Sequence, residues 1–333
     1  MSLPSKMHAL TLHQPQQDFS LQQDSLVLPT IGDRQLLIKV EYAGLNPVDT
    51  KLAYHGHTQW QYPHIPALDG VGVVVDSFVA HCPLIGKRVM WHGDLTKHGA
   101  LAQYVTVDAH AVAVVPDCIS PRDAATLPCA GMTAALALCK LQLKAGETIL
   151  IEAGAGGVGQ FAIQLAKAQE LTVYTTASKS NHKYLKKLGA DEVFDYKDPQ
   201  LALKLERALG VQRLDGVLDA VGGESTERNI KLLKFNGQIA CLNPLPSLEQ
   251  ALLFAKSPTI HVVSLGGAWL SNDICAQHKL GMKGEHLLSL LAQQTIRVPP
   301  ISVIDFNAQA VTSAMHNQLT GGVCGKQIVE INI

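Results

Sequence analysis

A glycine-rich segment between residues 148 and 167 contains the residue types that most directly suggest chemistry. It reads TILIEAGAGGVGQFAIQLAK, an apolar run followed by G-x-G-x-x-G and then by an amphipathic helical pattern. Gly154 permits a tight turn, Gly156 lets the backbone approach a pyrophosphate, and Gly159 lets the helix pack closely on the strand. The helix N-terminus offers free N–H groups to phosphate oxygens. The segment therefore predicts a dinucleotide-binding turn formed by Gly154, Gly156, Gly157, Val158 and Gly159.

The end of the next predicted strand bears on which dinucleotide binds. A site that prefers NAD usually carries Asp or Glu about 20 residues beyond the glycines, where it binds the ribose hydroxyls. Residues 173–180 read VYTTASKS and contain no acid. Thr176 and Ser178 can donate hydrogen bonds, and Lys179 can supply positive charge to a 2′-phosphate. The sequence thus favours NADPH over NADH, with the alternative that Lys179 merely begins a solvated helix.

These residues need a scaffold, and the chain changes character near residue 120. The first third has strand-like runs at 35–42, 70–75, 88–91 and 101–107, separated by Gly, Pro and His-rich connections, which predicts a small β-barrel or sandwich. Beyond residue 120, helical patterns alternate with short apolar strands, which is typical of a parallel βαβ sheet. Its strands are predicted at 147–153, 171–176, 192–195, 216–220, 237–242 and 261–265. A helix after Asn307 and a strand at 326–331 complete the chain.

Length, composition and charge limit the class of protein. The 333 residues suggest two domains, and 47% hydrophobic with 17% charged residues is enough for a packed core. Lys plus Arg is 27 and Asp plus Glu is 28, so the net charge is 27 − 28 = −1, which argues against a nucleic acid or anionic membrane partner. The seven scattered cysteines include no C-x-x-C pair and suggest reduced thiols. With no apolar leader or membrane-length apolar run, we expect a cytoplasmic protein.

Seven segments in register resemble the medium-chain dehydrogenase/reductase superfamily, specifically its zinc-free quinone oxidoreductase, or zeta-crystallin-like, branch. The matching segments cover nearly the whole chain. They are Ala43–Lys51 (AGLNPVDTK), Ile65–Val74 (IPALDGVGVV), Gly86–Val89 (GKRV), Leu127–Ala134 (LPCAGMTA), the Gly154–Gly159 turn, Asp215–Gly223 (DGVLDAVGG) and Gly325–Val329 (GKQIV).

The resemblance implies an α/β protein with a doubly wound Rossmann sheet and a GroES-like β-barrel catalytic domain. The catalytic domain would comprise residues 1–122 and 266–333, and the NADP-binding Rossmann domain residues 123–265. The resemblance also implies that Asn46, Thr133 and Lys326 lie near the nicotinamide, and it favours a homodimer formed through the Rossmann domain. Lys51 and Tyr54 follow Asn46 closely and are candidates to bind substrate or donate a proton, although a surface lysine and a loop tyrosine would look the same.

Zinc separates the branches of this superfamily. Catalytic zinc in the alcohol dehydrogenase branch takes Cys, His and Cys and keeps one position open. In register, these positions hold Asn46, Leu68 and Cys129, and a lone thiol does not hold zinc. We therefore expect no metal, and we interpret His55, His57, His64, His92 and His98 as polar loop histidines.

The function expected from these observations is zinc-independent transfer of a hydride from NADPH to a quinone or an α,β-unsaturated carbonyl. The protein would orient the reactants and stabilise the developing enolate or hydroquinone anion. One alternative is an alcohol dehydrogenase or enoyl-thioester reductase of the same superfamily. Another is a non-catalytic NADPH-binding protein with a structural or RNA-binding role.

Overall fold

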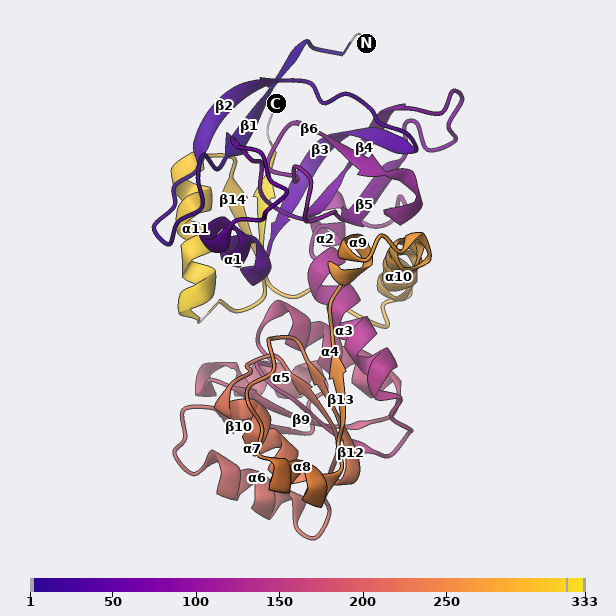
Figure 1. The fold of residues 1–333 in the computed structure, drawn as a ribbon. Coiled ribbons are helices and arrows are strands. Elements are labelled where there is room, and N and C mark those ends of the chain that lie inside the picture. The colour runs from indigo at the N-terminus through magenta and orange to yellow at the C-terminus, as the bar shows by residue number, and fades with distance from the viewer. Residues whose placement is uncertain (1–2, 322, 332–333) are drawn as a thin grey trace. The chain divides into compact units, whose positions relative to one another are not determined.

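A computed structural model describes residues 3–321 and 323–331 of the chain (Figure 1). These residues form two compact units. The discontinuous unit comprises Met1–Met132, Leu265–Gln294 and Val298–Ile333, and the inserted unit comprises Thr133–Ser264 and Thr295–Arg297. None of the described helices combines the length and the hydrophobicity needed to cross a bilayer. All seven cysteines lie in the described residues, and none forms a disulfide.

The discontinuous unit is built on a seven-stranded sheet in the order β14-β15-β3-β4-β5-β7, with β6 paired to β3, and a separate hairpin of β1 and β2. The strands are β1 (Lys6–Thr11), β2 (Gln22–Val27), β3 (Gln35–Leu45), β4 (Asp69–Ser77), β5 (Arg88–His92), β6 (Tyr104–Asp108), β7 (Val112–Val114), β14 (Ile301–Asp305) and β15 (Lys326–Glu330). The strand-rich domain predicted from the first third of the sequence is confirmed. In the described residues its strands pair along an open path from β14 to β7, so they do not close the ring that the word barrel implies.

Strand register brings four polar residues to one end of this sheet. Asp69, the first residue of β4, lies opposite Gly44 of β3 and opposite His92 of β5. Gln327 of β15 lies opposite Leu45 of β3. Because Lys326 precedes Gln327 and Asn46 follows Leu45, the ends of four neighbouring strands place Lys326, Asn46, Asp69 and His92 together.

Close packing fixes this register. A Cβ on Gly70 would lie 2.1 Å from the Trp91 ring, and a Cβ on Gly72 would lie 2.2 Å from the Lys39 carbonyl oxygen. The Trp91 side chain therefore fills the space that a side chain at position 70 would take. Trp91 belongs to a core that also contains Phe19 and Leu36. Helices of this unit are α1 (Pro47–His55), α2 (Pro121–Ala124), α9 (Gly267–Leu270), α10 (Ile274–Ala292) and α11 (Ala308–Thr320), with a 3₁₀ turn at Ala109–Ala111.

The inserted unit is a parallel six-stranded sheet in the order β10-β9-β8-β11-β12-β13. This doubly wound order reverses direction between β8 and β11, which is where such sheets bind ligands. Its strands are β8 (Thr148–Ile151), β9 (Thr172–Ala177), β10 (Glu192–Asp195), β11 (Leu214–Asp219), β12 (Leu233–Cys241) and β13 (Thr259–Val262). The predicted Rossmann sheet is confirmed.

Right-handed crossovers place α4 and α5 on one face of this sheet and α6, α7 and α8 on the other (Figure 1). The helices are α4 (Gly157–Ala168), α5 (His182–Leu188), α6 (Leu201–Leu209), α7 (Glu224–Leu232) and α8 (Gln250–Lys256), with a 3₁₀ turn at Lys179–Asn181. A further helix, α3 (Pro128–Leu141), begins in the discontinuous unit and ends in the inserted one.

In the inserted unit, the predicted bounds of β12 and β13 differ most from those observed. Strand β12 begins at residue 233 rather than 237, because Leu233 already pairs with Leu214 of β11. Strand β13 covers 259–262 rather than 261–265. Its partner β12 ends at Cys241, opposite Val262, so the residues beyond have no strand with which to pair.

Candidate functional site

The glycine-rich turn joins β8 to α4 at the reversal point of the parallel sheet. Gly156 is the N-cap of α4, and Gly157 is its first residue. The first N–H groups of a helix have no partner within it, so those of Gly157, Val158 and Gly159 are available to an anion. A Cβ on Gly159 would lie 2.5 Å from the Ala153 carbonyl oxygen, whereas a Cβ on Gly156 would meet only that oxygen, at 3.3 Å. Gly159 is thus required by packing, and Gly156 leaves the face of the turn open.

A buried ion pair braces the end of β8 just before this turn. The Glu152 side chain is 2% exposed and lies 2.5 Å from Nη2 of Arg228 on α7. Its carboxylate also accepts the Ser225 hydroxyl, with Oγ 2.7 Å and 2.9 Å from the two carboxylate oxygens. Burial raises the pKa of Glu152 above its ordinary value, although Ser225 and Arg228 oppose this shift. The network ties α7 to the strand that carries the turn.

The residues predicted to select the dinucleotide lie at the end of β9. Thr176 is buried, and its Oγ1 accepts the Ala153 N–H at 3.1 Å, so its hydroxyl oxygen supports the glycine-rich turn. Ser178 Oγ accepts the Asn181 side-chain amide at 3.1 Å. Lys179 is exposed and begins the 3₁₀ turn. Ser178 and Lys179 are therefore the two members of this group that lie nearer the surface.

In the discontinuous unit, Asp69 is the centre of a buried polar cluster. Its Oδ1 lies 2.7 Å from His92 Nδ1, which must donate because a carboxylate only accepts. Its Oδ2 accepts the Asn46 side-chain amide at 2.8 Å and the Cys129 backbone N–H at 3.0 Å, and Lys326 Nζ lies 3.3 Å away. Lys326 also donates to Asn46 Oδ1 and to the Leu45 carbonyl oxygen. We call Asn46, Asp69, His92 and Lys326 the Asp69 cluster.

A second carboxylate lies beside this cluster. Asp49 accepts the Asn46 backbone N–H at 2.7 Å and the Leu68 backbone N–H at 3.0 Å. Burial and the negative charge of Asp69 raise the pKa of Asp49 to about 6. Burial would likewise raise the pKa of Asp69, but Lys326, His92 and Asn46 outweigh it and hold that pKa below its ordinary value. The two carboxyl groups therefore differ in acidity because Asp69 contacts the side chains of Lys326, His92 and Asn46, whereas Asp49 accepts hydrogen bonds from backbone N–H groups.

The remaining predicted catalytic and nicotinamide-binding residues are not members of this cluster. Lys51 is exposed on α1. Tyr54, also on α1, lies 3.1 Å from Nδ1 of His316 on α11, whose Nε2 lies 2.9 Å from the Phe19 carbonyl oxygen. That carbonyl requires the proton on Nε2, so the tyrosine hydroxyl donates to Nδ1. Thr133 is half-buried on α3 and belongs to the inserted unit.

Two histidines are not the polar loop residues that the sequence suggested. His92 ends strand β5 and is buried against Asp69. His64 is also buried, and its ring stacks on Trp60 with centroids 3.6 Å apart. Local spacing could not reveal either environment, because each depends on pairing between distant segments. Asp49, Asp69 and His92 are therefore site residues that the sequence did not predict.

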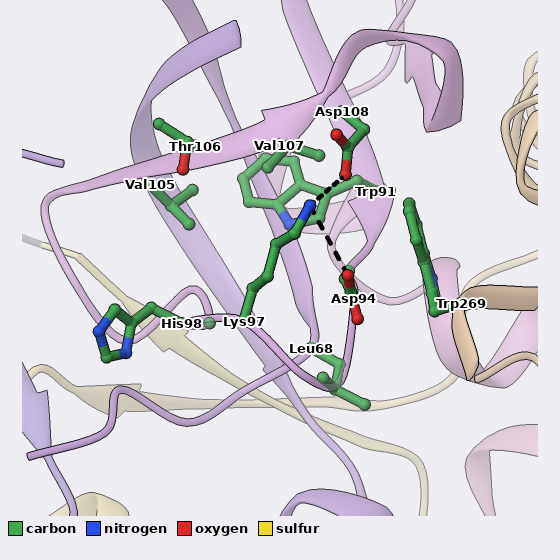
Figure 2. Close-up of a pocket in the computed structure, with 12 residues that line it drawn as sticks. Leu68, Trp91, Asp94, Lys97, His98, Val105, Thr106, Val107, Asp108 and Trp269 are labelled. Carbon is green, nitrogen blue, oxygen red and sulfur yellow. Dashed lines mark hydrogen bonds and ion pairs between the residues drawn. The ribbon is translucent and has the colours of Figure 1, made fainter. Parts of the chain in front are cut away.

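A small pocket in the discontinuous unit is lined in part by Leu68, the residue that precedes Asp69 in the sequence (Figure 2). It is lined by Trp91 and Trp269 and by Lys97, which lies 2.9 Å from an Asp108 carboxylate oxygen. Its volume of about 10 Å³ holds roughly one water molecule. This pocket is therefore too small for a nicotinamide or a quinone.

Comparison with known proteins identifies the family of this chain. Residues 32–117 match the alcohol dehydrogenase GroES-like domain, and residues 157–278 match the family described as zinc-binding dehydrogenase. A quinone oxidoreductase from Sus scrofa is 30% identical over 320 residues, which cover 92% of each chain. The chain belongs to the medium-chain dehydrogenase/reductase superfamily.

Oxidoreductases with different activities resemble this chain. A trans-enoyl reductase from Aspergillus flavipes is 30% identical over 325 residues, covering 90% of this chain and 92% of the relative. The solved structure of a quinone oxidoreductase from Coxiella burnetii is 28% identical, with a TM-score of 0.82 over 98% of this chain and 100% of that one. The chain is thus an oxidoreductase of the quinone oxidoreductase-like group, and the superfamily implies a nicotinamide cofactor.

The chain's own side chains decide whether zinc could bind, as the matched zinc-binding dehydrogenase family suggests. Donor atoms of Asp69, His92 and Cys129 lie within 4.8 Å of one another. However, Asp69 Oδ2 already accepts hydrogen bonds from Asn46, the Cys129 backbone N–H and the Lys326 ammonium. His92 Nδ1 is hydrogen-bonded to the other carboxylate oxygen, Oδ1. A divalent ion on Asp69 would be within about 7 Å of that ammonium, where repulsion amounts to about 5 kcal/mol at an effective dielectric constant of about 20. This donor set does not fit zinc.

Proposed function

We propose that the protein is a zinc-independent, NADPH-dependent reductase that transfers a hydride to a quinone or an α,β-unsaturated carbonyl. The observation that carries the proposal is the Gly154–Gly159 turn, which lies at the reversal point of the parallel sheet with an open face at Gly156 and free N–H groups behind it. The activities of the relatives, quinone oxidoreductase and trans-enoyl reductase, support the two substrate classes.

The residues at the end of β9 support NADPH over NADH. No acidic side chain stands at 173–180, where an NAD-specific site would bind the ribose hydroxyls. Lys179 is exposed, and the hydroxyl of Ser178 lies one residue before it. An exposed ammonium and a hydroxyl are suited to a 2′-phosphate, whose charge an acid would repel.

The chain's own contribution to the reaction is positioning and charge stabilisation. NADPH, when bound, would supply the hydride. The N–H groups of Gly157, Val158 and Gly159 would hold its pyrophosphate. Asn46 is held by Lys326 through Oδ1 and by Asp69 through one N–H, and its second N–H has no partner within the described residues. That N–H would orient a ribose hydroxyl or the carbonyl oxygen on which negative charge develops.

An activated acceptor suits such a site better than a simple ketone. Without a Lewis acid, charge on the reduced substrate must be spread by its own conjugation and by hydrogen bonds. A quinone or an enone delocalises that charge, whereas an unactivated ketone does not. The trans-enoyl reductase relatives make an enoyl thioester the second candidate substrate.

A spectrophotometric screen tests this proposal. Purified protein with NADPH is offered a quinone, an enone, an enoyl thioester and a simple ketone, and consumption is followed at the nicotinamide absorbance band. We expect consumption with the first two and none with the ketone. Tight NADPH binding without consumption of any substrate would instead support a non-catalytic cofactor-binding protein.

A further inference from the structure

Lys326 is buried in a manner that is unusual for a lysine. Its side chain is 4% exposed, and the Asp69 carboxylate beside it is fully buried. Nζ contacts three oxygen atoms, which belong to the Leu45 carbonyl, the Asn46 amide and the Asp69 carboxylate. An ammonium has three N–H donors, so each has an oxygen acceptor. The group is therefore surrounded by oxygens in the way that a bound cation would be.

Two strand pairings hold this arrangement in place. The pairing of β15 with β3 sets Lys326 beside the end of β3, and the pairing of β4 with β3 sets Asp69 there. Removing one partner of a buried ion pair is strongly destabilising, because it leaves the other charge buried without compensation. Lys326 is thus fixed in place as the counter-charge of Asp69.

We propose that the Lys326 ammonium is the resident cation of this site and that it prevents Asp69, His92 and Cys129 from binding a divalent metal. The three side chains have the right chemistry for a transition metal, with a carboxylate, an imidazole and a thiol whose donor atoms lie within 4.8 Å of one another. The fixed positive charge beside Asp69 is the element that makes the trio unsuitable. The inference rests on the zinc-independent part of the proposed function and supplies its physical cause.

The same contacts make Lys326 a positioning residue for Asn46. Because the ammonium can bond only to the oxygen of the amide, Oδ1 must face Lys326 and Nδ2 must face Asp69. A metal on Asp69 would displace this arrangement. The orientation of the Asn46 amide therefore depends on whether the Lys326 ammonium or a metal ion occupies the position beside Asp69.

The test is a Co²⁺ titration of the purified full chain, read by the visible d–d bands and the sulfur-to-cobalt charge-transfer band. Lys326→Gln removes the charge but keeps an amide that can donate hydrogen bonds. We expect it to bind one equivalent of Co²⁺ about 5000-fold more tightly than the wild type, which is the repulsion at an effective dielectric constant of about 20 expressed as an affinity ratio. The charge-transfer band should vanish when Cys129→Ser is added.

Two controls accompany the titration. Lys167→Gln also removes one positive charge, that of a lysine that pairs with Asp191 in the inserted unit. It should leave Co²⁺ binding as in the wild type. Circular dichroism and cooperative urea unfolding of Lys326→Gln show whether the variant is folded.

The proposal is overturned if folded Lys326→Gln binds Co²⁺ no more tightly than the wild type. It is also overturned, with no variant needed, if the wild type itself binds one equivalent with a charge-transfer band. Because these readouts are metal binding and not turnover, they are independent of whether the protein reduces quinones, enones or neither.

Discussion

Replacing Gly156 by alanine separates the binding role of the glycine-rich turn from its structural role. Gly156 has a φ of −74°, which any L residue adopts, and an added Cβ would have only the Ala153 carbonyl oxygen nearby, at 3.3 Å. We therefore expect the variant to fold, with a stability change of about 0.5 kcal/mol at this N-cap position.

The expected loss is in cofactor affinity. The added methyl group would stand on the open face of the turn, where the pyrophosphate must approach the backbone N–H groups. A hydrogen bond to a charged group is worth about 1.5–3 kcal/mol, so losing one raises the Kd for NADPH by about 10- to 150-fold.

Gly159→Ala is the matched comparison. Its Cβ would lie 2.5 Å from the Ala153 carbonyl oxygen and 2.6 Å from the Gly154 Cα, both backbone atoms that cannot rotate away. This variant should lose stability itself, by about 1–3 kcal/mol. Calorimetric titration with NADPH and urea unfolding of both variants provide the measurements. A folded Gly156→Ala protein with wild-type NADPH affinity would refute the assignment of this turn to the pyrophosphate.

Three further predictions concern dinucleotide choice, a buried ion pair and a buried histidine. Lys179→Ala should raise the Kd for NADPH about 10-fold and leave the Kd for NADH unchanged. Replacing Lys187, another exposed lysine, by alanine should change neither Kd. Equal effects of Lys179→Ala on both cofactors would speak against a 2′-phosphate contact. Arg228→Met should cost about 3 kcal/mol in urea unfolding at neutral pH, because it leaves the Glu152 carboxylate buried without its partner. Since burial already raises the pKa of Glu152, this penalty should shrink as the pH falls and the carboxyl takes up a proton; a penalty independent of pH would contradict the account. Burial, reinforced by His98 and His57, lowers the pKa of His64 to about 3. Below pH 6.5 the unfolded chain therefore binds a proton at His64 that the folded chain does not bind. The folded state thus loses stability as the pH falls. Urea unfolding should therefore show the cost of His64→Gln shrinking by about 2 kcal/mol between pH 7.5 and pH 5, and a constant cost would show that His64 does not stay neutral.

The last of these comparisons must be made as a difference between wild type and variant. Asp49 has its pKa raised to about 6, so the folded chain holds a proton there that the unfolded chain releases above pH 4. Its contribution to stability therefore falls as the pH rises and opposes that of His64. Subtracting the variant removes the Asp49 contribution, because both proteins contain it.

The sequence predicted those features that depend on neighbouring residues. The turn at Gly154–Gly159 is specified by a strand, three glycines and a helix within 20 residues, so its place in the fold could be read directly. The alternation of strands and helices likewise predicted the doubly wound sheet. Both patterns arise from local geometry that a linear chain displays.

The Asp69 cluster could not be predicted in the same way. Its members come from β15, β4 and β5 and from the N-cap of α1, and they meet only because of antiparallel register. The resemblance placed Asn46 and Lys326 near the site, but it did not show that Lys326 contacts Asp69 or that His92 is buried there. Thr176 was predicted to bind the dinucleotide. In the structure its hydroxyl oxygen accepts a hydrogen bond from the backbone N–H of Ala153, a contact that the sequence did not reveal.

The most direct test of the central claim follows one deuterium atom. NADPH labelled with deuterium at the transferable position of C4 is incubated with an enone and with protein whose zinc content has been measured in the same sample. We predict a saturated product that carries the deuterium at its β-carbon, formed at full rate by protein with far less than one zinc per chain. A product without deuterium, or activity that rises in proportion to zinc content, would contradict zinc-independent hydride transfer from NADPH.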